Sequence, residues 1–158
     1  MPARETFEEI ARQRERLSSA KLSIAELESK LQPRAQGYEP MAHGTSDPDR
    51  MTGAALVSIQ IGRLKAELPR VERRLEKRME RATHVLYGRS GRGGLAKAKG
   101  TTDADIICCH YLEGMGWVEI AKEIVRSETE YPSQWCRQRA MRAFAYIDRV
   151  GMDVLAES

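Results

Sequence analysis

The chain has 158 residues, a length that allows one domain or two small ones and excludes a large barrel or a multidomain enzyme. Apolar residues make up 41% and aromatic residues 6%, which is too apolar for complete disorder and favours a helical, partly extended protein. The net charge of +3 hides three unlike blocks: 8 basic and 9 acidic residues over 1–62, 12 and 4 over 63–99, and 6 and 10 over 101–158. The middle block is therefore strongly basic.

The sequence indicates a protein that is neither exported nor embedded in a membrane. No apolar run is long enough to cross a bilayer, and the N-terminus is charged where an export signal would be apolar. The three cysteines are odd in number, and two of them are adjacent, which suits neither a disulfide framework nor a zinc site. We therefore expect a cytoplasmic protein with reduced thiols and no metal or cofactor.

The first element is an amphipathic helix from about residue 4 to residue 32. Its apolar residues Ile10, Leu17, Ile24 and Leu31 recur every seven positions, which predicts a narrow apolar seam. Residues 33–50 contain three prolines and two glycines, so we expect them to form a connecting loop.

A second heptad pattern follows the loop and ends near Val85. Its apolar residues are spaced alternately by four and three, Arg78 falls on the seam, and Pro69 predicts a kink or break near Leu68. The two seams fit either an antiparallel hairpin or a dimer, and the pattern does not choose between them. We assign residues 1–87 to this helical hairpin or coiled coil.

Residues 88–101 are rich in glycine, arginine and lysine and predict a flexible basic linker. The remaining residues, 102–158, predict a small domain of three helices, the first of them capped by Thr102 and Asp103. The second helix begins at Trp117, a polar loop ends at Pro132, and the third helix, capped by Ser133, runs to Gly151. The fold class is therefore all-α.

A short helix followed by a turn and a longer basic helix is typical of the helix-turn-helix, whose second helix enters the DNA major groove. Glutamine can pair with adenine, and arginine can pair with guanine or phosphate. The glutamines and arginines of the last predicted helix therefore favour double-stranded DNA as the partner. The candidate DNA-binding residues are Ser133, Gln134, Arg137, Gln138, Arg139 and Arg142 on the last helix, and Arg89, Arg92, Lys97 and Lys99 in the linker.

The segments YLEGMGWVEIAKEIV and WCRQRAMRAFAYI resemble the promoter-reading region of bacterial sigma factors. They look most like the sigma-like transcriptional regulators of the ArpU and RinA type that phages and prophages encode, whose upstream coiled coil and Ser-Asp-Pro loop are also similar. This resemblance implies regulation of bacteriophage genes in a bacterial host, with contact to host RNA polymerase. The loop from Val125 to Ser133 is longer than in that group, which leaves the register of the last helix open.

Two other functions fit the same pattern. A phage small terminase subunit also joins a helix-turn-helix to an oligomerising helical segment, and an adaptor that does not bind DNA would bind a partner through the seams. A homo-oligomer through the N-terminal helices fits the seams as well. No phosphate-binding loop, nucleophile elbow or HExxH pair is present in the sequence, and His43 and His84 are isolated, so we expect no catalytic residue and no enzyme activity.

Overall fold

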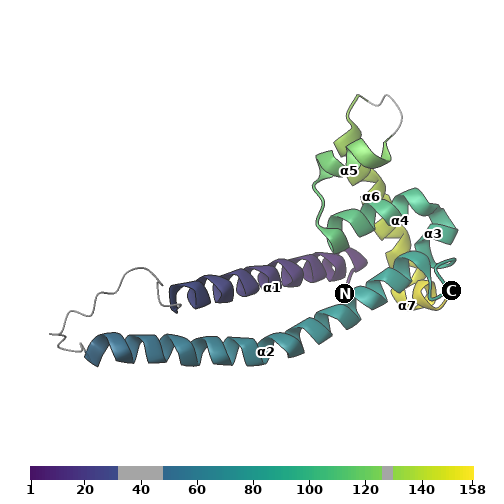
Figure 1. Ribbon diagram of the computed structural model, residues 1–158. Coiled ribbons are helices and arrows are strands. Elements are labelled where there is room, and N and C mark those ends of the chain that lie inside the picture. Colours follow the sequence, from purple (N-terminus) through teal and green to yellow (C-terminus); the bar gives the residue numbers. More distant parts are fainter. Residues whose placement is uncertain (32–47, 126–129) are drawn as a thin grey trace. The chain divides into compact units, whose positions relative to one another are not determined.

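The computed structural model describes residues 1–31, 48–125 and 130–158, and every regular element within these ranges is helical (Figure 1). The prediction of an all-α fold is confirmed for this part of the chain. The predicted loop 33–50 lies outside the described residues except for Pro48 and the two residues after it, which begin a helix. The elements are α1 (Ala3–Leu31), α2 (Pro48–Tyr87), α3 (Gly94–Lys99), α4 (Thr101–Ile107), the π-helix η1 (Cys108–Glu113), α5 (Trp117–Ile124), α6 (Pro132–Val150) and α7 (Met152–Glu157).

The chain divides into two compact units. Unit 1 combines Met1–Arg14 with Arg74–Ser158, and unit 2 is Glu15–Arg73. Both long helices are therefore shared between the units. This division differs from the sequence-based one, which separates residues 1–87 from residues 102–158.

Unit 2 consists of the second half of α1 and the first part of α2. Ion pairs join Lys21 to Glu72 and Glu28 to Lys65, so the residue number rises along one helix as it falls along the other. The two helices therefore run antiparallel within one chain, as a hairpin. α2 is one continuous helix through Pro69, so of the predicted kink or break the break does not occur.

The apolar seam of the hairpin is buried at only some of the predicted positions. Ile24 and Ile61 are buried, whereas Leu31 and Val71 are exposed. A straight α-helix drifts by about 20° per heptad relative to a seven-residue repeat, which turns some seam positions away from the neighbouring helix.

The core of unit 1 is built partly from the first 14 residues. The side chain of Phe7 is fully buried, and its ring packs edge-on against Phe144 and Tyr111 at centroid distances of 5.5 and 6.3 Å. Arg78, the charged residue on the seam, donates two hydrogen bonds of 3.1 and 2.9 Å to the carboxylate of Glu9. Bidentate pairing of this kind allows an arginine to occupy a seam position.

The N-terminus of α1 is held by the far end of the sequence. The backbone N–H of Ala3 donates to Oδ1 of Asp148 on α6, at 2.6 Å. The first N–H groups of a helix lack partners within the helix, so this carboxylate acts as a cap, and its negative charge suits the positive end of the helix.

The segment 88–101 contains structure where the sequence predicts a flexible linker. Residues 94–99 form α3, and Leu95 is completely buried. Three of its five glycines, Gly88, Gly93 and Gly94, are crowded: Gly88 has a φ of +72°, and a Cβ there would lie 2.6 Å from a backbone oxygen of Ser158. A single leucine among glycines and lysines gives no periodic signal, which is why the sequence did not reveal this helix.

The rest of unit 1 packs α4, α5 and α6 together (Figure 1). α4 continues directly into η1, which ends at Gly114 in the left-handed conformation. Ile120 and Ala121 form the buried side of α5 against α6. The hydroxyl of Tyr87 donates to the carboxylate of Asp105 at 2.6 Å, which ties the end of α2 to α4, and burial with this carboxylate raises the pKa of the tyrosine.

Within the described ranges, none of the helices combines the length and the apolar character that crossing a membrane requires.

Candidate nucleic-acid interface

α6 has one apolar side and one polar side. Cys136, Ala140, Ala143, Phe144 and Ile147 are buried, and they recur at the three- and four-residue spacing of one helix face. The opposite side is exposed over nearly the whole helix, and no acidic residue occurs between Pro132 and Ile147. This exposed face carries Gln134, Arg137, Gln138, Met141, Arg142, Ala145, Asp148 and Arg149.

The predicted DNA-binding residues of α6 are not equally accessible. Gln134, Arg137, Gln138 and Arg142 are exposed, whereas Ser133 is half-buried in the first turn. Ser133 is not the N-cap: the helix starts at Pro132 after Tyr131, and no side chain caps it. Proline is well suited to the first helical turn, since its missing N–H would have no partner there.

The predicted residues of the basic segment lie at two places. Arg89 and Arg92 are exposed in the turns between α2 and α3, and Lys97 and Lys99 are exposed on α3. Lys99 lies beside α6, where it lines a hollow with three residues predicted to bind DNA.

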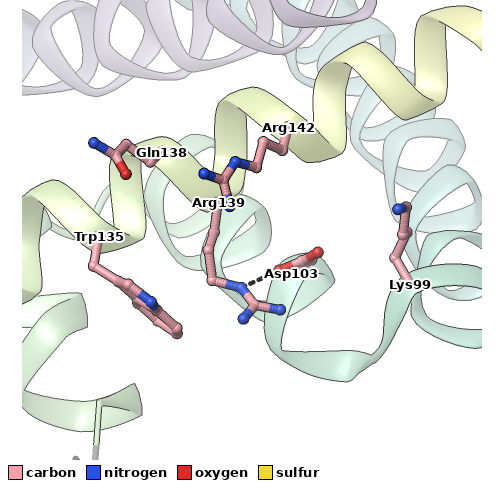
Figure 2. Close-up of a pocket in the computed structure, with 6 residues that line it drawn as sticks. All are labelled: Lys99, Asp103, Trp135, Gln138, Arg139 and Arg142. Atoms are coloured by element: carbon pink, nitrogen blue, oxygen red, sulfur yellow. Dashed lines mark hydrogen bonds and ion pairs between the residues drawn. The ribbon is translucent and has the colours of Figure 1, made fainter.

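A hollow of about 270 Å³ lies between α6 and the junction of α3 with α4 (Figure 2). Three of the predicted α6 residues and Lys99 line it together, although the sequence places them in different predicted elements. Its six lining residues are Lys99, Asp103, Trp135, Gln138, Arg139 and Arg142.

An ion pair forms one wall of this hollow. Nε of Arg139 donates to Oδ1 of Asp103 at 2.5 Å, and the Asp103 side chain is 11% exposed. The Arg139 guanidinium also lies 4.8 Å from the ring centre of Trp135. Arg139 is therefore fixed by two contacts and is less free to reach a base than the sequence suggests.

Asp103 differs from the role predicted for it. The sequence indicates a helix cap at Thr102 and Asp103, but the N-cap of α4 is Gly100, and Asp103 turns into the interface with α6. One side of α6 carries four residues at three- and four-residue spacing, a pattern present in the sequence but not predicted as a site: Trp135, Arg139, Arg142 and Tyr146.

Two cations flank the ring of Tyr146. The Lys99 ammonium lies 5.1 Å and the Arg149 guanidinium 5.2 Å from its centre. Cations are attracted to the face of an aromatic ring, so the Tyr146 ring holds one cation from α3 and one from α6 close together. One of the two, Lys99, also lines the hollow.

Comparison with known proteins gives no relatives. No family model, curated protein or solved structure matches the chain.

A second aromatic group lies toward the start of α6. The rings of His110 and Trp117 stack at 3.8 Å, and the Arg137 guanidinium lies 5.8 Å from the Trp117 ring. Nδ1 of His110 is 2.8 Å from the carbonyl oxygen of Met115; since a carbonyl only accepts, Nδ1 carries the proton. The Trp117 ring therefore lies close to the Arg137 guanidinium, while Arg137 stays exposed.

The adjacent cysteines of η1 are not poised for chemistry at neutral pH. Burial, reinforced by the charge of Glu113, raises the pKa of Cys109 to about 11 and also raises the pKa of Cys108. The thiolate is the form that attacks electrophiles and binds metals, so these protonated thiols are poor nucleophiles and poor ligands.

Proposed function

We propose that this protein is a sequence-specific, non-enzymatic DNA-binding regulator of phage or prophage genes, in which α5 and α6 act as a helix-turn-helix. The observation that carries the proposal is the exposed face of α6, which presents Gln134, Arg137, Gln138 and Arg142 with no acidic residue among them. The resemblance of this region to sigma-like regulators supports the same function.

The chemistry of that face suits the edges of DNA bases. Arginine makes paired hydrogen bonds to guanine, and glutamine makes them to adenine, in the major groove. Gln134, Arg137, Gln138 and Met141 lie at the three- and four-residue spacing of one helix side, so they can meet successive base pairs together. We assign base reading to Gln134, Arg137 and Gln138, and not to Arg139, because Asp103 engages its guanidinium.

The packing behind α6 supports its role as the recognition helix. α5 lies against α6 through Ile120 and the small residue Ala121, and Phe144 anchors the middle of α6 to Phe7 and Tyr111. A helix that is fixed from behind can present its side chains with a defined spacing.

The hairpin offers a surface for a second copy of the chain. Leu22, Leu56 and Ile59 of unit 2 are 64%, 62% and 56% exposed. Burial of these side chains against a partner would remove apolar surface from water, which favours association. We propose a dimer through these helices, which would present two recognition helices to a two-part site. Host RNA polymerase is a further proposed partner.

The decisive experiment is selection of bound duplexes from a random pool, followed by affinity measurements on the selected site. Arg137→Ala should weaken binding by about 1–3 kcal/mol, roughly 5- to 150-fold, and relax the preference at one base position. Arg16→Ala is the matched control, since Arg16 is an exposed arginine of unit 2 on α1, outside the exposed face of α6. Absence of an enriched sequence, or equal effects of the two variants, would contradict the proposal.

Oligomeric mass separates this function from its main rival. Light scattering should give a dimer for a regulator, whereas a ring of many subunits would favour a small terminase subunit that recognises packaging-site DNA. A protein that fails to bind any duplex at low salt would instead be an adaptor for a protein partner.

A further inference from the structure

The hollow between α6 and the α3–α4 junction carries an excess of positive charge. Of its lining residues, Lys99, Arg139 and Arg142 are cationic and Asp103 is the single acid, which leaves a formal charge of +2. Asp103 is largely buried, and its negative charge is neutralised by the ion pair with Arg139. The surface that a ligand meets is therefore cationic.

The cations of the hollow are held in place before any ligand arrives. The ion pair with Asp103 occupies Nε of Arg139, and the Trp135 ring covers one side of its guanidinium, so its two terminal nitrogens keep a fixed direction (Figure 2). Contact with Tyr146 restrains Lys99 in the same way. Among the described residues, neither Lys99 nor Arg142 has an ion-pair partner.

We infer that this hollow binds one backbone phosphate of DNA, with Lys99 and Arg142 as its principal ligands and Arg139 as a fixed wall. The inference rests on the proposed function, because Gln138 and Arg142 belong both to the exposed face of α6 and to the lining of the hollow. A duplex that meets the exposed face of α6 brings phosphates to this side of the helix. Trp135 supplies an apolar surface for the attached sugar.

This phosphate contact would have a distinct task. Contacts to bases read the sequence, whereas contacts to phosphates fix the position and orientation of the protein on the duplex. Lys99 comes from α3, outside the helix-turn-helix, so it would hold the backbone from a second element. The phosphate would thereby set the register in which Gln134, Arg137 and Gln138 meet the bases.

The test compares two lysines of one helix. Lys99 and Lys97 are both exposed on α3, but only Lys99 lines the hollow. Binding of a fluorescent mixed-sequence duplex is measured over a salt series. Each phosphate neutralised contributes about 0.9 to the slope of log K against log salt, so Lys99→Ala should reduce that slope by about 0.9 and weaken binding about eightfold at 0.1 M salt. Lys97→Ala should change both much less.

A second arm uses inorganic phosphate and follows the fluorescence of Trp135 in a Trp117→Phe background. Free phosphate should change this fluorescence in the parent and not after Lys99→Ala. If the duplex fails to bind but phosphate still gives this result, the hollow is a phosphate site and the proposed DNA-binding function is overturned. Circular dichroism of each variant confirms folding.

Three results would overturn the inference. The first is an equal loss of slope for Lys97→Ala and Lys99→Ala, which would show diffuse attraction rather than a seated phosphate. The second is no response of Trp135 to phosphate together with an unchanged slope for Lys99→Ala. The third is a response to a glutamate-rich peptide and not to phosphate or duplex, which would assign the hollow to an acidic protein.

Discussion

Replacing Phe7 by alanine tests whether the first 14 residues complete the core of unit 1. Phe7 is 0% exposed. A buried phenylalanine removes roughly 200 Å² from water, worth about 5 kcal/mol, of which alanine retains a part, while the cavity left behind adds a cost. We expect Phe7→Ala to lower the free energy of unfolding by about 3–5 kcal/mol, which for a unit of this size lowers Tm by roughly 15–25 °C.

The assay is urea unfolding followed by tryptophan fluorescence. Both tryptophans of the chain, Trp117 and Trp135, belong to unit 1, so the signal reports that unit. Val154→Ala is the control, because Val154 is an apolar residue of the same unit but is 61% exposed; it should cost less than about 0.5 kcal/mol. An unfolding midpoint for Phe7→Ala that matches the parent would refute the assignment of the N-terminal segment to this core.

Two further perturbations probe the backbone and the seam. Gly88 and Gly91 both have a φ of +72°, but only at Gly88 would a Cβ meet other atoms, so Gly88→Ala should destabilise by about 1–3 kcal/mol more than Gly91→Ala in thermal unfolding. Equal losses would show that only the backbone conformation matters. Arg78, through its hydrogen bonds and charge, lowers the pKa of Glu9. A lowered carboxyl pKa stabilises the fold above the ordinary glutamate pKa and loses that effect as pH falls, so the stability difference between the parent and Arg78→Gln should shrink below about pH 4. A difference that stays constant down to low pH would exclude this ion pair as its source.

The sequence predicts several local elements because they follow from periodicity and from the glycine that stops a helix, whereas the predicted N-caps at Thr102, Asp103 and Ser133 are wrong. The heptads of Ile10 and Ile24 indicate α1, and the apolar pattern around Ile120 indicates α5. α6 ends at Val150 and Gly151 follows it, which agrees with the prediction that a glycine stops this helix.

The parts that were missed depend on contacts between distant residues. Asp103 and Arg139 are 36 positions apart, and each alone fits a local role: a helix cap for one and a DNA contact for the other. The packing that joins them, and with it the hollow, appears only when α4 lies against α6. The burial of Leu95 also depends on contacts with distant residues, because no periodic apolar pattern surrounds it in the sequence.

The cap that Asp148 provides for α1 has a consequence for how the chain is made. Ala3 and Asp148 are 145 positions apart. At about 5–20 residues per second, the ribosome needs roughly 7–30 s to supply that carboxylate after Ala3 has been added to the chain. During that interval Phe7 and Ile10 have no core to enter, and unit 1 closes only when the last helices emerge. Its earliest-made segment is thus among the last to find its place.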